Sequence, residues 1–120
     1  MGHLMGLRRT VADLTAREQA ALADFQRRVG LASPGVSTRY TVFGSRARGT
    51  ADADSDLDVC VELDVERLSF ADKQKIRRAA GEVSLTHDLL LSVLVIDRVL
   101  AKEREGFSIM AAIREEGIPL

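Results

Sequence analysis

Hydrophobic and polar residues recur along the first half of the chain in patterns typical of a helix followed by two strands. Thr15 and Glu18 form a capping box at the start of an Ala-rich run that ends at Gly30, which predicts a helix. Alternating β-branched and aromatic residues then predict strands, because strand side chains point to opposite faces in turn. The predicted elements are a helix over 15–29, a strand over 36–43, a short helical turn over 45–50, an acidic loop over 51–55 and a strand over 57–63.

The second half combines helical patterns with one long apolar run. Residues 85–96 are almost continuously apolar, and periodicity alone does not separate a strand from a buried helix there. Their β-branched residues favour a strand buried on both faces. The other predicted elements are a helix over 69–80 that Gly81 follows, helices over 98–105 and 107–116, and a stop at 117–119. Together these elements predict one α/β domain over 1–120, with a small mixed sheet flanked by helices and a loose N-terminus over about 1–12.

Two motifs in the middle of the chain carry the candidate chemistry. Asp56 and Asp58 are two residues apart on a predicted strand, so their carboxylates point to the same face. Two carboxylates held so close repel each other, and a hard divalent cation such as Mg²⁺ resolves that repulsion. Upstream, Gly44 and Ser45 form a strand-to-helix turn where backbone can approach an anion closely. A phosphate site facing a carboxylate pair predicts phosphoryl or nucleotidyl transfer.

These motifs resemble the nucleotidyltransferase superfamily that includes the DNA polymerase β catalytic core. Its pattern is hydrophobic-Gly-Ser, a spacer, and Asp-hydrophobic-Asp on the next strand, here Phe43-Gly44-Ser45 and Asp56-Leu57-Asp58. The arginines between them resemble the minimal, antitoxin-like branch, whose members are often paired with HEPN-type toxins. The resemblance implies the polymerase β-like fold, Mg²⁺ as cofactor and ATP or another NTP as substrate. The nucleotide-binding residues that it implies are Gly44, Ser45, Arg46, Arg48 and Ser55.

The superfamily also uses a third carboxylate on a following strand, as a metal ligand and as a general base. Asp88 is the candidate here, because it lies in the apolar run, where an unpaired charge would be costly. The catalytic and metal-binding set implied by the resemblance is therefore Asp56, Asp58 and Asp88. His87 stands where the family has a hydrophobic residue, and we interpret it as a structural or surface histidine. Asp97 is the competing candidate, but its position predicts the N-cap of the next helix.

Composition and charge exclude several classes of protein. A net charge of −1 argues against a general nucleic-acid coat protein. No apolar run reaches the ~18–20 residues that span a membrane, and the first residues lack the features of a signal peptide. The single cysteine, Cys60, excludes an internal disulfide and is expected to be a buried structural thiol. A cytoplasmic location is the expectation from this cysteine usage.

Three functional hypotheses follow. The first is an enzyme that transfers NMP to a hydroxyl, and the resemblance implies AMP from ATP, with a tyrosine of a helical HEPN-type partner as acceptor. The second is a non-catalytic antitoxin or regulatory module that acts by occlusion, which a missing third carboxylate would favour. The third is a small-molecule nucleotidyltransferase of the aminoglycoside-modifying kind, which would need a separate acceptor-binding subunit or a homodimer cleft.

Overall fold

The chain folds around one four-stranded sheet with the strand order β3-β2-β1-β4. The computed structural model describes residues 9–52 and 55–120. Strand β1 pairs antiparallel with β2 and β4, and β2 pairs parallel with β3. The elements are η2 (Val11–Asp13), α1 (Ala16–Ala32), β1 (Thr38–Phe43), α2 (Gly44–Arg48), β2 (Leu57–Leu63), α3 (Phe70–His87), β3 (Leu91–Ile96), α4 (Arg98–Glu103), α5 (Ser108–Glu116) and β4 (Ile118–Pro119).

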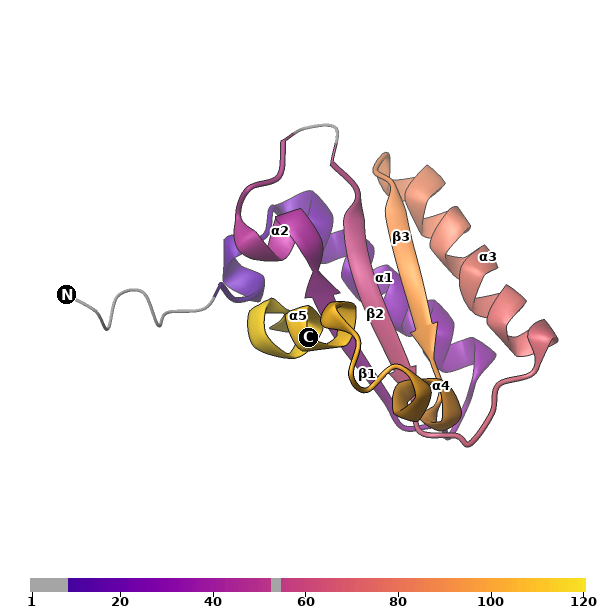
Figure 1. The fold of residues 1–120 in the computed structure, drawn as a ribbon. Helices are drawn as coiled ribbons and strands as arrows, with labels where there is room; N and C mark the ends of the chain where they lie inside the picture. Colours follow the sequence, from indigo (N-terminus) through magenta and orange to yellow (C-terminus); the bar gives the residue numbers. More distant parts are fainter. Residues whose placement is uncertain (1–8, 53–54) are drawn as a thin grey trace.

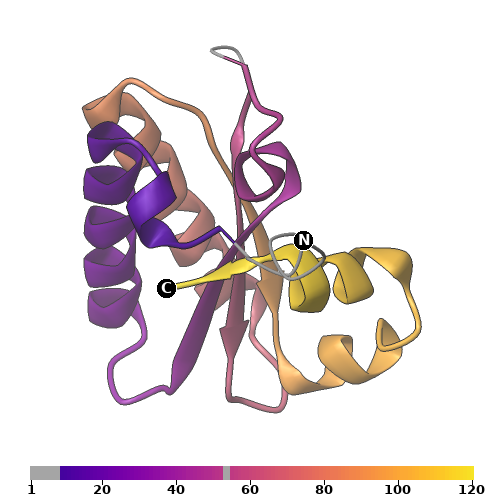
Figure 2. The same cartoon turned by 90° about the vertical axis from the view of Figure 1, so that its left-hand side faces the viewer.

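Helices cover both faces of the sheet. Helices α1 and α3 lie side by side on one face, and α4 and α5 lie on the other (Figures 1 and 2). The larger core lies beneath α1 and α3 and includes the fully buried Phe25, Ile76 and Val59. A smaller core on the other face is formed by Cys60, Ile96, Met110 and Ile113. The predicted α/β class, with a mixed sheet flanked by helices, is confirmed. None of the helices in the described part of the chain is long and apolar enough to cross a membrane.

Both long helices continue past the glycines that were expected to end them. Gly30 lies inside α1 and Gly81 lies inside α3. In α3 the buried stripe formed by Ile76, Ala80 and Val83 crosses Gly81 without interruption. Burial of that stripe outweighs the cost of an internal glycine, which is about 1 kcal/mol relative to alanine.

The prediction of a strand over 85–96 is wrong at its first half. Residues 85–87 form the last turn of α3, Asp88 follows with a φ of 53°, and β3 begins only at Leu91. The hydroxyl of Ser84 accepts a hydrogen bond from the Leu91 amide at 3.0 Å and so fixes the turn between the two elements. Strand β3 is at an edge of the sheet and Ser92 is exposed, so the expected burial on both faces is also wrong.

Both ends of the described chain are more ordered than the sequence indicated. The expected stop at 117–119 contains β4, in which Ile118 pairs with Val42 of β1. Within the expected loose terminus, the Thr10 amide donates to the Asp13 carboxylate at 2.7 Å and caps η2. Residues 1–8 lie outside the described part of the chain.

The side chain of Asp24 links helices α1 and α3, which cover the larger core. Asp24 Oδ2 of α1 lies 3.0 Å from His87 Nε2 of α3, and Asp24 Oδ1 accepts from Arg28 Nε at 3.1 Å. The His87 contact is the main reason that the pKa of Asp24 falls from 3.8 to about 2. The structural role expected of His87 is confirmed.

We expect Asp24→Asn to lower the free energy of unfolding at neutral pH. The pKa of Asp24 is lower in the folded chain than in the unfolded chain, so its contribution is complete well above pH 3.8 and is lost as the pH falls toward about 2. Urea denaturation at several pH values measures this contribution. The variant should show a flatter pH dependence below pH 4 than wild type, and an unchanged dependence would contradict the assignment.

Candidate functional site

The two sequence motifs meet where the backbone of Gly44 approaches the carboxylate of Asp58. Strand β1 ends at Phe43, which is paired with Asp58 across the antiparallel ladder. The chain then turns through Gly44, whose φ of 73° is in the left-handed region. A Cβ at Gly44 would overlap Asp58 Oδ2 and lie 3.3 Å from Asp58 Cγ. Glycine is therefore required here both for its conformation and for the room that it leaves to the carboxylate.

Asp56 and Asp58 act on each other electrostatically, as their spacing predicted. Asp58 is half-buried at the start of β2. Burial raises its pKa, the neighbouring charge of Asp56 raises it further, and the guanidinium of Arg48 opposes both effects. A hard divalent cation would relieve this repulsion, and carboxylate oxygens are the ligands that Mg²⁺ prefers. The two aspartates therefore fit a Mg²⁺ site.

The expected third carboxylate is not beside this pair. Within residues 9–52 and 55–120, no three histidine, cysteine or acidic side chains are grouped so that they could hold a metal ion. Asp88 lies in the turn after α3 and not on a strand. It lines a cavity of about 450 Å³ together with Glu18, Arg46 and Ser55. Leu57, which belongs to the core under α1 and α3, lines the same cavity. Because alternate strand residues face opposite ways, that cavity is on the other side of the sheet from Asp58.

Strand register identifies the residue that does lie beside Asp58 on β3. Asp58 is paired with Ser92 across the parallel ladder, and paired residues of neighbouring strands present their side chains on the same face. The neighbour on this strand is therefore a hydroxyl and not a carboxylate. Asp97, the competing candidate, is an N-cap as expected, because its carboxylate accepts from the amides of Leu100 at 2.8 Å and Leu68 at 2.9 Å.

Arg46 has protein partners on two other elements. Its Nε lies 3.2 Å from Glu18 Oε2, and its Nη2 donates to the Ser55 carbonyl at 2.7 Å. Glu18 is itself almost completely buried and accepts from the Thr15 amide through Oε1 at 2.8 Å. Arg46 therefore ties α1 and α2 to the residue that precedes Asp56. The sequence identified Glu18 only as a capping residue and did not indicate this pairing.

The other predicted nucleotide-binding residues lie around the same turn. Arg48 is about half exposed, and its Nη1 lies 3.7 Å from the Glu116 carboxylate at the end of α5. It is also close enough to Asp58 to act on its pKa. The Ser45 carbonyl accepts from the Thr50 amide at 3.0 Å and so closes α2.

The hydroxyl of Ser55 supports the acidic loop before β2. It donates to Asp52 Oδ1 at 3.2 Å and accepts from the Asp52 amide at 3.1 Å. These contacts account for a serine at this position without a ligand. Asp54, the other acidic residue of the loop, lies outside the described residues.

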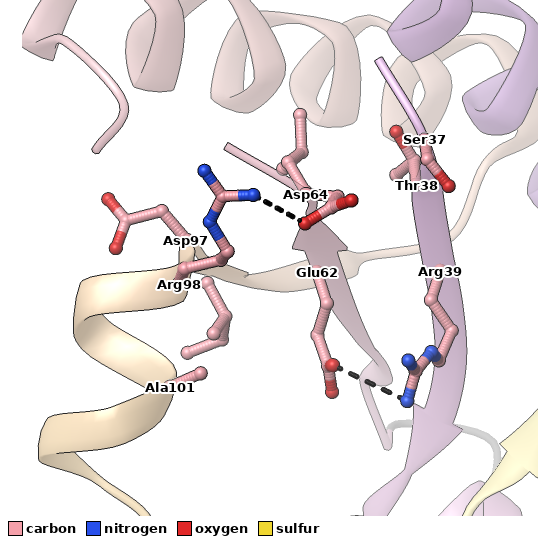
Figure 3. Close-up of a pocket in the computed structure, with 10 residues that line it drawn as sticks. Ser37, Thr38, Arg39, Glu62, Asp64, Asp97, Arg98 and Ala101 are labelled. Atoms are coloured by element: carbon pink, nitrogen blue, oxygen red, sulfur yellow. Dashed lines mark hydrogen bonds and ion pairs between the residues drawn. The ribbon is translucent and has the colours of Figure 1, made fainter. Parts of the chain in front are cut away.

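A second cavity, of about 510 Å³, lies at the opposite end of β2 (Figure 3). Its charged side chains neutralise one another, because Arg98 lies 2.9 Å from Asp64 and Arg39 lies 3.8 Å from Glu62. Asp97 at its border has both carboxylate oxygens in hydrogen bonds to amides. The acidic side chains of this cavity are therefore paired with arginines or amides. They do not form a repelling carboxylate pair like Asp56 and Asp58, so the cavity is a weaker candidate for a cation site.

Comparisons with known proteins agree with this geometry. The sequence profile of the nucleotidyltransferase domain matches residues 23–118. A protein of Methanocaldococcus jannaschii named "Putative protein adenylyltransferase" is 39% identical over 62 residues, which are 52% of this chain. The match spans 62% of that relative's length, less than two thirds. The profile covers the candidate site and most of the fold, so the chain belongs to the nucleotidyltransferase domain family of transferase enzymes.

Proposed function

We propose that this domain is a Mg²⁺-dependent nucleotidyltransferase that transfers AMP from ATP to a hydroxyl group. The observation that carries the proposal is the packing of the Asp58 carboxylate against Gly44, with the charge of Asp56 beside it. This packing places a repelling carboxylate pair next to a backbone turn that carries Ser45 and Arg48. Membership of the nucleotidyltransferase domain family supports the same reaction.

The reaction would join the acceptor oxygen to the α-phosphorus and break the bond from that phosphorus to the oxygen that bridges to the β-phosphate. Pyrophosphate would leave, and the hydroxyl proton would pass to a base. Asp56 and Asp58 would hold Mg²⁺, which when bound neutralises charge on the phosphates. Arg48 would contact the phosphates from α2. The base that the family resemblance implies is Asp88. It lines a cavity on the opposite side of the sheet from Asp58, so its role as base is a proposal that the Asp88→Asn experiment below tests.

The proposed acceptor is a protein side chain, a tyrosine hydroxyl of a helical partner of the HEPN type. Two considerations support it. The relative from M. jannaschii bears a name that describes transfer of AMP to protein, and the arginines between the two motifs resemble the branch that accompanies HEPN-type partners.

A second candidate function is that of a non-catalytic module that binds and occludes its partner. One specific observation favours it: the position beside Asp58 on β3 is Ser92, and the described residues group no third carboxylate with Asp56 and Asp58. A site with two carboxylates can still bind a metal nucleotide, but it would lack a base beside the metal ligands. The transfer experiment below separates the two functions.

We expect Asp58→Asn to abolish the rise in melting temperature that MgATP gives to the wild-type domain. Without MgATP the variant should melt no lower than wild type, because a repelling carboxylate has been removed. The matched control is Asp64→Asn, since the Asp64 side chain is 63% exposed and pairs with Arg98 beyond the other end of β2. A full MgATP effect in the Asp56→Asn, Asp58→Asn double variant would refute the metal site.

If Asp88 is the base, Asp88→Asn should bind MgATP nearly as wild type does and should transfer AMP ~10²–10⁴-fold more slowly, the usual contribution of a general base. Asparagine tolerates the left-handed φ of 53° at this position, so the fold should persist. Intact-mass spectrometry of the protein encoded next to this gene, incubated with ATP and Mg²⁺, measures the added AMP.

Three results of that experiment decide between the roles. Equal transfer by wild type and Asp88→Asn would reject Asp88 as base. A stable complex without transfer by wild type would support the occluding module. Transfer gained in Ser92→Asp, which adds a carboxylate beside Asp58, would show that the wild-type chain lacks only this group.

The two arginines are expected to respond differently to removal. Arg46→Ala leaves the buried Glu18 carboxylate without its positively charged partner, so the substitution should lower the free energy of unfolding by roughly 3–5 kcal/mol. Adding Glu18→Gln to the same chain should restore part of that stability. Arg48→Ala removes an exposed ion pair worth ~0–1 kcal/mol and should weaken ATP binding instead. Urea denaturation and calorimetric titration with a non-hydrolysable ATP analogue measure both effects. A stable Arg46→Ala variant that no longer binds nucleotide would place Arg46 on the phosphates.

A further inference from the structure

Asp56 lies just before β2, so the pairing of the sheet does not hold it directly. The pairing of β2 with β3 begins at Leu57, and the pairing with β1 begins one residue later. The peptide units on either side of Asp56 are held by other contacts. The Ser55 carbonyl accepts from Arg46 Nη2 at 2.7 Å, and the Leu57 amide donates to the Leu90 carbonyl at 2.9 Å. Because a peptide unit is planar, these two contacts fix the backbone on both sides of the Asp56 side chain.

The arginine that holds the Ser55 carbonyl belongs to α2, the helix that begins with Gly44 and Ser45. Its guanidinium therefore links the proposed phosphate-binding turn to the peptide unit that Ser55 shares with Asp56. The guanidinium is planar and presents its donors in a rigid fork. The direction of the donor that holds Ser55 consequently depends on what fixes the other nitrogens of Arg46.

Glu18 of α1 fixes the other side of that guanidinium. Glu18 Oε2 lies 3.2 Å from Arg46 Nε, in the geometry of an ion pair rather than of a directed hydrogen bond. The Glu18 side chain is 8% exposed and that of Arg46 is 21% exposed. Glu18 is held in turn, because its Oε1 accepts from the Thr15 amide at 2.8 Å and its amide donates to the Thr15 hydroxyl at 3.1 Å. The capping box of α1 is thus connected through Arg46 to the backbone of Asp56.

Stability alone does not account for a charged side chain at Glu18. Removing two charges from water offsets most of their attraction, so a buried ion pair adds little beyond apolar side chains of similar volume. The capping box does not need the charge either, because glutamine completes it as glutamate does. A cavity of about 450 Å³ lies beside Glu18, Arg46 and Ser55. Without the Glu18 charge, the guanidinium would have room to turn away from the Ser55 carbonyl.

We propose that Glu18 is a positioning residue for the metal site. Through Arg46 it fixes the peptide unit between Ser55 and Asp56, and so the placement of the Asp56 carboxylate beside Asp58. This inference rests on the proposed function, because it concerns the Mg²⁺ that Asp56 and Asp58 would hold. It also assigns Arg46 to the backbone of the metal-binding segment and not to the phosphates.

Calorimetric titration with a non-hydrolysable ATP analogue, once in Mg²⁺ and once in EDTA, tests the inference. The ratio of the two affinities measures what the metal contributes to binding, and contacts from the chain to the nucleotide cancel in it. Glu18→Gln is expected to lower this ratio by about tenfold or more, as loss of a group that holds a metal ligand in place does. The affinity in EDTA should stay at the wild-type value. Glutamine retains the capping box and removes only the charge that holds Arg46.

A double variant, Glu18→Gln with Arg46→Ala, separates positioning from stability. It has no unpaired buried charge, so urea denaturation should show it to be more stable than Arg46→Ala alone. Its affinity ratio should nevertheless stay as low as that of Glu18→Gln. The matched control is Arg28→Ala, because Arg28 is 27% exposed and its ion pairs with Asp24 and Glu82 lie between α1 and α3. The control should be less stable than wild type and should keep the wild-type ratio.

The same titrations can overturn the inference. A folded Glu18→Gln variant with the wild-type ratio would do so and would leave the proposed function standing. A ratio that recovers with stability in the double variant would reduce Glu18 to a structural role. An affinity that falls equally in Mg²⁺ and in EDTA would place Arg46 on the phosphates instead. A wild-type chain that binds the analogue equally in Mg²⁺ and in EDTA would refute the proposed metal site and this inference with it.

Discussion

The close packing of a carboxylate against a glycine backbone is the contact on which the candidate site depends. Asp58 can lie where it does only because Gly44 has no side chain and adopts a left-handed φ. The antiparallel register of β1 and β2 brings the two residues together, and the Arg46 contacts to Glu18 and Ser55 hold the surrounding segments. A larger side chain at Gly44 would therefore displace the Asp58 carboxylate as well as the turn between β1 and α2.

The sequence predicted those elements whose signals are local. The bounds of β2 are correct because a period-two pattern between an acidic loop and a polar segment leaves little alternative. The division of 85–96 between α3 and β3 was missed, although Thr86, His87 and Asp88 interrupt the apolar residues there. Periodicity does not separate a strand from a buried helix in so short an apolar run. The division is fixed by a hydrogen bond from the Leu91 amide to Ser84 and by the left-handed turn at Asp88. The two-residue strand β4 was missed because pairing with β1 is a tertiary contact.

The candidate site could also be predicted only in its local parts. The Gly-Ser turn and the carboxylate pair could be recognised because each is contiguous in sequence and because their spacing is that of a known family. The partner of Arg46 could not be recognised, since Glu18 lies in a different helix. The residue that lies beside Asp58 on β3 could not be recognised from the sequence either. An apolar strand can pair in more than one register, and only the structure places Ser92 at that position.

The burial of Cys60 makes the chain's one thiol a reporter of its own unfolding. Cys60 lies in the centre of β2 with no exposed surface, and burial raises its pKa to about 12. The thiolate is the reactive form of cysteine, so alkylating reagents can modify this position only when the sheet opens. The rate of modification in native conditions would then measure how often the sheet separates from α5, without any introduced label.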